Sequence, residues 1–301
     1  MKTFRQALHG KQFAISAELS LGRASTHQDI ARQASIFRGR VDGVQIADNP
    51  LAWVHMSAVS ASALVLREGL DPVPILTCRD RNRIALLSDL LGLRAMGVSS
   101  LLLMRGRRVP ARHALHASTV FDLTGRELIA MAAGIGEDED APSPFFIGTG
   151  VKAHRARKGW RAEALNQKAE LGAQFIQTQI CYNLDLMKHY LQRLVEARAT
   201  WDFSVIASLA PLPSSETARW VKENMPDSKI PKRLVQRIEQ AADPEQEAVL
   251  ACAETMQAMS EIPGLSGIHL MTTGDAELIG AAIDTSGLAR TEGAGQQEAQ
   301  A

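Results

Sequence analysis

The chain has 301 residues, 46% of them hydrophobic and 22% charged, with 33 basic residues against 33 acidic ones. A net charge of zero gives no reason to expect nucleic acid or an anionic membrane as a partner, and no apolar run approaches the ~18 residues of a membrane span. The length suits a single α/β barrel, which typically needs ~250 residues.

Cysteine usage and the first residues bear on the cellular compartment. Cys78, Cys181 and Cys252 show neither paired nor metal-ligand spacing, and the opening MKTFRQALHGKQ lacks the apolar core of a signal peptide. Both features are typical of a protein in a reducing cytoplasm. We therefore expect a cytoplasmic, single-domain protein without a metal site, and we leave open whether it forms a homo-oligomer.

Short segments rich in β-forming residues recur along the chain, and the segment QFIQTQICY is the clearest of them. It places Gln179, an uncharged amide, near the carboxyl end of an otherwise apolar strand. The strands expected from this pattern cover residues 13–20, 43–47, 74–78, 99–104, 144–149, 174–182, 203–209 and 267–271.

Capping residues, glycines and prolines mark the helices between these strands. Thr124 and Glu127, for example, have the spacing of a capping box. The expected helices run from 25 or 26 to about 37, then over 51–68, 82–96, 162–171 and 184–197, with further helices starting at 124, 214, 231, 244 and 275. From 285 to 301 the chain is polar and rich in Gly and Gln, so we expect a disordered tail after a barrel domain of residues 1–284.

Eight strands that alternate with helices indicate a single (β/α)8 TIM barrel. A doubly wound open sheet is the alternative, but no Gly-x-Gly-x-x-Gly follows the first strand. No Walker lysine loop is present either, which excludes the P-loop class.

Polar side chains follow the ends of these strands, and in parallel α/β folds such groups face the functional site. Cations there suit a phosphate-bearing cofactor or a polycarboxylate tail, amides can bind a heterocycle, and one buried carboxylate can serve as a general acid. The polar residues at the strand ends are Glu18, Gln45, Asp48, Thr77, Arg105, Arg107, Lys152, His154, Gln179, Tyr182, Ser208, Thr272 and Thr273.

Each of these side chains also has a purely structural interpretation. Glu18 could form a salt bridge at the barrel mouth, and Arg105 and Arg107 could be ordinary loop charges. His154 is more often a loop histidine than a base, and a glutamine such as Gln179 is often satisfied by neighbouring backbone. The sequence alone leaves these alternatives open.

Four stretches occur in a recognisable order: Glu18 within SAELS, then PILTC, LLLMRG and LGAQFIQTQICYN. This ordered set resembles the methylenetetrahydrofolate reductase family over about residues 13–284. The resemblance implies a TIM barrel that holds FAD at the carboxyl ends of its strands. It also implies an enzyme that reduces methylenetetrahydrofolate to methyltetrahydrofolate with electrons from NAD(P)H.

The same resemblance implies roles for individual residues. Glu18 would be the acid that helps to open the methylene bridge by protonating a folate nitrogen. Among the strand-end residues described above, those expected to bind the substrate are Gln45, Arg107 and Gln179. The expected cofactor-binding residues are Thr77, Met104, Arg105, Gly106, Lys152, His154, Glu163, Asn166 and Lys168.

Several positions depart from the family pattern. The family's aspartate after LRG is Arg107 here, the histidine before its LTC segment is Ile75, and the aspartate that ends its sixth strand is Asn183. The family's aromatic residue in the loop after the fifth strand has no counterpart near Thr149 and Gly150.

These departures leave more than one chemistry open. In one, FAD relays the electrons, and a cation at Arg107 stabilises the anionic reduced ring and favours oxidation of methyltetrahydrofolate. In the other, hydride passes directly from the nicotinamide to the folate. A folate-binding methyltransferase component or methyl-carrier partner, without redox activity, is the alternative from another class.

Overall fold

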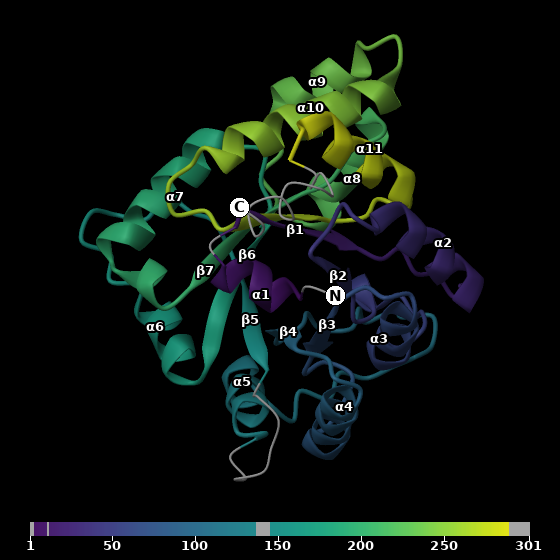
Figure 1. Ribbon diagram of the computed structural model, residues 1–301, viewed down its shortest axis with the longest axis vertical. Helices are drawn as coiled ribbons and strands as arrows, with labels where there is room; N and C mark the ends of the chain where they lie inside the picture. The colour runs from purple at the N-terminus through teal and green to yellow at the C-terminus, as the bar shows by residue number, and fades with distance from the viewer. Residues whose placement is uncertain (1–2, 11, 137–144, 289–301) are drawn as a thin grey trace, which may run out of the picture.

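Eight parallel strands close into one barrel in the computed structural model of the chain, which describes residues 3–10, 12–136 and 145–288 (Figure 1). Each strand pairs with the next, and the last pairs with the first, which confirms the TIM-barrel prediction. The strands are β1 (Ala14–Glu18), β2 (Gly43–Ile46), β3 (Pro72–Thr77), β4 (Ser100–Met104), β5 (Phe146–Val151), β6 (Ala173–Ile180), β7 (Ser204–Leu209) and β8 (Gly267–Leu270).

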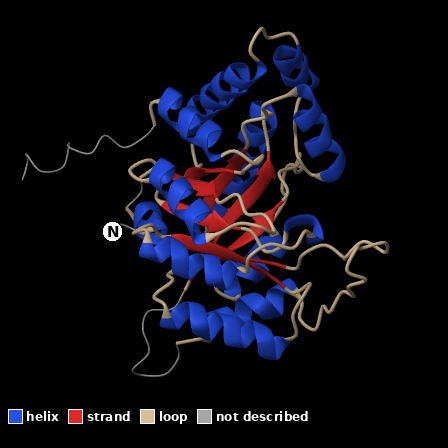
Figure 2. Ribbon diagram, turned by 90° about the vertical axis from the view of Figure 1, so that its right-hand side faces the viewer, coloured by secondary structure: helices blue, strands red, loops and turns tan. Residues whose placement is uncertain are grey.

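The helices surround the strands, which lie at the centre of the molecule in Figure 2. The side chains of Thr26, Asn82 and Thr124 each accept the backbone N–H three residues later, and this fixes where three of the helices begin. The helices are α1 (Phe4–His9), α2 (His27–Phe37), α3 (Ala58–Arg67), α4 (Arg83–Ala95), α5 (Gly125–Ala133), α6 (Glu163–Glu170), α7 (Leu184–Glu196), α8 (Ser215–Asn224), α9 (Lys232–Glu239), α10 (Pro244–Ser260) and α11 (Ala276–Ser286), with short 3₁₀ turns η1 (Pro50–Ala52) and η2 (Ala199–Trp201).

Helix α1, which the sequence did not predict, closes the amino-terminal end of the barrel (Figure 1). The Phe4 ring is buried, and its centroid lies 5.6 Å from the centroid of the Phe175 ring. The Phe175 ring in turn stacks on the Phe146 ring, with a centroid distance of 5.1 Å. A Cβ on Gly148 would lie only 2.1 Å from the Phe175 ring, so glycine makes room for this packing. The barrel is therefore filled at this end, and its open end lies at the carboxyl ends of the strands.

Polar side chains form the next part of the barrel interior toward the open end. Gln177 Nε2 on β6 donates to Gln45 Oε1 on β2 at 3.1 Å, and Ser16 Oγ lies 3.0 Å from His269 Nδ1. Burial lowers the pKa of His269 to about 3, so this imidazole stays neutral at ordinary pH. In each pair the two side chains satisfy one another's hydrogen-bonding groups in the interior below the open end.

One expected helix begins later than predicted. Instead of a helix over 51–68, the chain makes the η1 turn, with Leu51 and Ala52 in left-handed backbone, and α3 starts only after Ser57 caps it. The helix α11 ends at Ser286, two residues past the predicted end of the barrel domain. Residues 289–301 of the expected tail, and Pro144 at the expected start of the fifth strand, lie outside the described residues.

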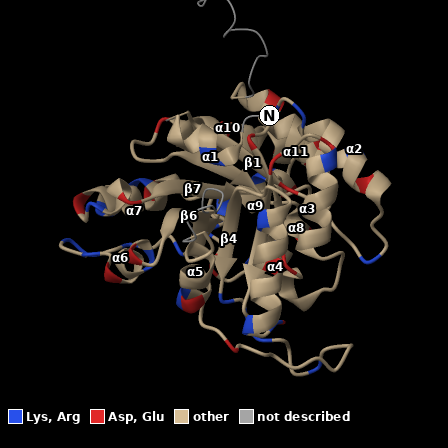
Figure 3. Cartoon of the chain, turned by 60° about the horizontal axis from the view of Figure 1, so that its bottom comes forward, with Lys and Arg blue, Asp and Glu red and all other residues tan. Residues whose placement is uncertain are grey.

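Between β7 and β8 the chain makes an excursion through α8, α9 and α10. The segment that joins α8 to α9 returns to the barrel and pairs with the end of β6 through the bridge between Cys181 and Lys229. Acidic and basic residues are distributed over many elements (Figure 3). No helix among the described residues is both long enough and apolar enough to cross a bilayer.

Candidate active site

A cavity of about 670 Å³ occupies the open end of the barrel. It lies where the carboxyl ends of the strands meet, which is the usual position of TIM-barrel active sites. Of the residues expected to act on substrate or cofactor, those that line the cavity are Glu18, Thr77, Met104, Arg105, Gly106, Arg107, Lys152, Lys168 and Gln179. Those that do not line it are Gln45, His154, Glu163 and Asn166.

Glu18 ends β1 and is the buried acid of the cavity. Its side chain is only 7% exposed, and its Oε2 accepts the backbone N–H of Thr272 at 2.9 Å. Burial raises the pKa of Glu18 to about 7, although the Thr272 hydrogen bond works in the opposite direction. No ion pair involves Glu18 among the described residues, so the salt-bridge alternative is not what the structure shows. A carboxyl group with this pKa can both donate and accept a proton near neutral pH.

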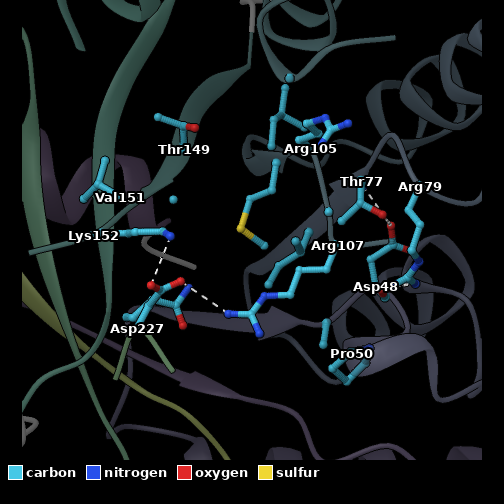
Figure 4. Close-up of a pocket in the computed structure, with 18 of the residues that line it drawn as sticks. Asp48, Pro50, Thr77, Arg79, Arg105, Arg107, Thr149, Val151, Lys152 and Asp227 are labelled. Atoms are coloured by element: carbon cyan, nitrogen blue, oxygen red, sulfur yellow. Dashed lines mark hydrogen bonds and ion pairs between the residues drawn. The ribbon is translucent and has the colours of Figure 1, made fainter. Parts of the chain in front are cut away.

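Asp48 organises the wall of the cavity next to Glu18. Its Oδ2 accepts both the backbone N–H of Thr77 at 2.8 Å and the Thr77 hydroxyl at 2.7 Å (Figure 4). It also pairs with Arg81. Arg79 Nη2 donates to the carbonyl oxygen of Asn49 at 2.9 Å and fixes the loop after β2. The Thr77 hydroxyl is therefore already engaged, and Thr77 contributes to the site through its position rather than as a free donor.

Three cations gather beside the amino end of α5. Arg105 follows β4 and lies with its guanidinium carbon 4.1 Å from the centroid of the Phe121 ring, while Lys168 Nζ donates to Thr149 Oγ1 at 3.1 Å. Burial, and then the charge of Arg126, lower the pKa of Lys168. Within the described residues, none of these three cations forms an ion pair, so we call Arg105, Arg126 and Lys168 the open cation cluster.

The amino end of α5 adds to this positive region. Thr124, Gly125 and Arg126 all line the cavity, and a Cβ on Gly125 would lie 3.3 Å from the backbone nitrogen of Arg105. Glycine at this position lets the helix start close to the end of β4. Helix amino ends attract anions, and together with the open cation cluster this end forms a site suited to phosphate. Sequence reasoning missed Arg126, although its place in the first turn of a capped helix was visible.

A second group of charges stands at another part of the cavity wall. Asp227, in the segment between α8 and α9, pairs with Arg107 at 3.3 Å and with Lys152 at 3.0 Å (Figure 4). Asp227 was not predicted, because it lies 120 residues from Arg107 in the sequence. Its carboxylate partly balances the two cations that the sequence had offered for substrate and cofactor.

Gln179 and three methionines complete the cavity. Gln179 is half-buried, and its amide has no hydrogen-bond partner among the described residues, which leaves it free for a ligand. Met104, Met225 and Met271 provide an apolar, adaptable lining. A Cβ on Gly150 would lie 2.9 Å from Met104 Sδ, so this glycine gives Met104 its room.

The expected residues outside the cavity have other partners. Gln45 is buried in the barrel interior against Gln177, and His154 packs edge-on against the Trp160 ring with a centroid distance of 5.2 Å. Asn166 Nδ2 donates to the carbonyl oxygen of Arg161 at 3.1 Å. Glu163 is exposed in the first turn of α6. For these four residues the structure therefore provides no contact with the cavity.

The fold and the site together define a class: a TIM-barrel protein with a buried acid and a cluster of cations in one cavity at the carboxyl ends of its strands. The family follows from comparison of the sequence. The chain belongs to the methylenetetrahydrofolate reductase family, whose model matches residues 3–287. No curated protein sequence matches it significantly.

Two examples of solved structures that share the fold follow. One is an uncharacterized protein from Clostridium thermocellum described as binding two copies of 5-methyl-5,6,7,8-tetrahydrofolic acid. It is 13% identical, covers 94% of this chain and 97% of its own, and has a TM-score of 0.65. The other is EDTA monooxygenase (EmoA) from Chelativorans sp. BNC1, at 13% identity, 91% and 92% coverage and a TM-score of 0.54. At these identities the likeness concerns the fold.

Proposed function

We propose that the chain interconverts 5,10-methylenetetrahydrofolate and 5-methyltetrahydrofolate, with a nicotinamide nucleotide as the electron partner. The observation that carries this proposal is Glu18, a buried acid with a pKa of about 7, in the same cavity as an open cation cluster. Membership of the methylenetetrahydrofolate reductase family supports it. The acid can transfer a proton to a folate nitrogen, and the open cation cluster can bind the phosphates of a dinucleotide.

Glu18 has a defined task in this reaction. When the methylene bridge opens, the carbon–nitrogen bond that breaks leaves an electron pair on a folate nitrogen, and the protonated Glu18 carboxyl donates its proton there. A hydride then reaches the methylene carbon and gives the methyl group. In the oxidative direction the Glu18 carboxylate takes the proton back. The free amide of Gln179 can orient the pterin by hydrogen bonds.

The residues present fit FAD as well as a nicotinamide nucleotide, because both carry a pyrophosphate. The open cation cluster and the amino end of α5 would hold that group. When bound, FAD supplies hydride transfer between the nicotinamide and the folate. Arg107 is balanced by Asp227, so the expectation that its charge tunes a reduced flavin ring gains no support from the geometry.

Two measurements test the proposal. Purified protein, with and without added FAD, is assayed with methylenetetrahydrofolate plus NADH or NADPH, and with methyltetrahydrofolate plus an electron acceptor. We expect turnover in at least one direction and a flavin absorbance band in the visible spectrum. Parallel double-reciprocal plots would indicate the flavin relay. Intersecting plots without flavin absorbance would indicate direct hydride transfer, and no turnover of correctly folded protein would overturn the function.

A further inference from the structure

Arg107 and Lys152 form a pair of cations on the cavity wall, separate from the open cation cluster. Arg107 follows β4 and Lys152 follows β5, and the two side chains converge on the Asp227 carboxylate from different strands (Figure 4). Arg107 and Lys152 are 51% and 70% exposed, whereas the side chain of Asp227 is 25% exposed. Both cations are therefore accessible to water, and both line the cavity.

The backbone of Asp227 is held in place by hydrogen bonds rather than by its ion pairs. Two residues later, Lys229 donates its N–H to the carbonyl oxygen of Ile180 at 2.7 Å and accepts the N–H of Tyr182 at 2.8 Å. Ser228 Oγ donates to the carbonyl oxygen of Met225 at 2.5 Å. The segment is thus fastened to the end of β6, so the backbone of Asp227 is fixed at the cavity, while its carboxylate is held by the ion pairs with Arg107 and Lys152.

Arg107 keeps a second partner that does not depend on Asp227. Its Nη1 donates to the carbonyl oxygen of Asn224 at 3.2 Å, at the carboxyl end of α8 where the helix dipole favours a cation. The guanidinium would therefore stay in position if the Asp227 side chain turned away. Ion pairs exposed to water are weak, so another anion can take the place of Asp227 at little cost.

We propose that Arg107 and Lys152 form a subsite for the carboxylates of the folate's glutamate tail, and that Asp227 occupies this subsite until the substrate displaces it. This inference rests on the proposed function. Arg107 and Lys152 together with Asp227 leave one net positive charge, which suits a carboxylate. In the described part of the chain no acid pairs with the open cation cluster, which suits the more highly charged pyrophosphate. Specificity for the tail would then be set at the rim, away from Glu18.

Calorimetric titration of the full-length protein tests this subsite without requiring turnover. The probes are 5-methyltetrahydrofolate, the tail-less 5-methyltetrahydropterin, and NADH. We expect Arg107→Gln and Lys152→Gln to weaken 5-methyltetrahydrofolate binding about tenfold, since each removes a charge-assisted hydrogen bond. Asp227→Asn should strengthen it severalfold. None of the three should change the affinity for 5-methyltetrahydropterin, and the exposed Lys158→Gln on the same loop should change neither.

The outcomes separate this inference from the proposed function. If the unaltered protein does not bind 5-methyltetrahydrofolate, both proposals fall together. If it binds, but the charge variants leave its affinity unchanged, only the tail subsite is overturned. If the variants change the affinity for NADH instead, the pair is a phosphate site and the inference is again wrong. Weaker binding confined to the tail-bearing ligand, with the gain in Asp227→Asn, supports it.

Discussion

Glu18 keeps its proton near neutral pH because its carboxyl group is buried with a single backbone donor, and no cation among the described residues pairs with it. In the reductive direction the group must be protonated, so kcat/KM for methylenetetrahydrofolate should fall as the pH rises through about 7. In the oxidative direction it must be ionised, so kcat/KM for methyltetrahydrofolate should fall as the pH drops through the same value.

Substitution of Glu18 tests this assignment. Glu18→Gln keeps the size and one acceptor but cannot transfer a proton, so we expect the folate half-reaction to slow by ~10²-fold or more. Both pH profiles should lose their inflection near neutrality, while folate affinity changes little. Stopped-flow or steady-state rates at several pH values measure this, and unchanged folate kinetics would remove Glu18 from the mechanism.

Among the described helices, α5 is the one whose amino end lines the cavity beside the end of β4, and we expect it to bind an anion there. Arg126 makes no ion pair among the described residues and lines the cavity near Lys168, so we expect its charge to bind a ligand rather than to stabilise the fold. We expect Arg126→Gln to weaken dinucleotide binding by about tenfold, the loss of one charge-assisted contact. The melting temperature should stay unchanged. Titration with NADH and with FAD measures the effect.

A matched control for Arg126 is available in the loop after β1. Arg23 is exposed and forms no ion pair within the described residues, so Arg23→Gln removes the same charge away from the cavity. If both variants weakened binding equally, the effect would come from the overall field and not from the amino end of α5. If neither did, the open cation cluster would not be the dinucleotide site.

The η1 turn explains why one helix was predicted too long. The apolar residues from 51 onward fit a helix, but Asn49 and Arg79 fix a different backbone: the Asn49 side chain accepts the N–H of His55 at 3.2 Å, and Arg79 donates to the Asn49 carbonyl. These contacts join residues up to 30 positions apart, so local sequence preference could not reveal them. They hold Leu51 and Ala52 in left-handed backbone at the cavity edge.

Strain in this turn gives a stability prediction. A non-glycine residue in left-handed backbone costs ~1–2 kcal/mol, so Ala52→Gly, at a φ of 66°, should leave the free energy of unfolding unchanged or raise it by up to ~1 kcal/mol. Ala63→Gly, inside α3, should lower it by ~1 kcal/mol. Urea denaturation of both variants measures the difference. Equal losses in the two would show that the turn is not strained.

For the whole molecule, local patterns predicted all eight strands, because strand and helix signals are local. The missing Gly-x-Gly-x-x-Gly after the first strand then favoured a closed barrel over an open sheet, and the structure confirms the barrel. The ordered motifs also placed Glu18, Arg105 and Gln179 at the cavity. What sequence reasoning lacked depends on packing between distant segments. Gln45 turns inward to Gln177, 132 residues away, and Asp227 reaches the cavity only through the excursion after β7.

Helix α1, which closes the amino-terminal end of the barrel, was also missed because its stability depends on packing between distant segments. Its six residues carry no strong periodic signal, and their helix gains its stability from the barrel interior. Phe4 is fully buried, and its backbone N–H donates to Asp71 Oδ2 at 2.8 Å. Burial raises the pKa of Asp71 to about 6, against the effect of that hydrogen bond.

Two buried acids with raised pKa values make the stability of the whole fold depend on pH. The unfolded chain loses the Glu18 proton near 4.5 and the folded chain near 7, so the free energy of unfolding should fall as the pH rises between these values and level off above. At ~1.4 kcal/mol per pKa unit the Glu18 part amounts to about 3 kcal/mol. Asp71 acts in the same direction between 3.8 and about 6. The buried His269 acts in the opposite direction between about 3 and 6.5, because the folded protein keeps it neutral while the unfolded chain takes up a proton as the pH falls.

Urea denaturation of the unaltered protein and of Glu18→Gln at pH 5 and pH 8 isolates the Glu18 part, because Asp71 and His269 contribute to both proteins. Between these pH values the unaltered protein should lose more stability than Glu18→Gln, by about 3 kcal/mol. The exposed Glu261→Gln should behave like the unaltered chain. Equal changes in the unaltered protein and in Glu18→Gln would mean that Glu18 is ionised in the folded state, and would remove the basis for its role as an acid.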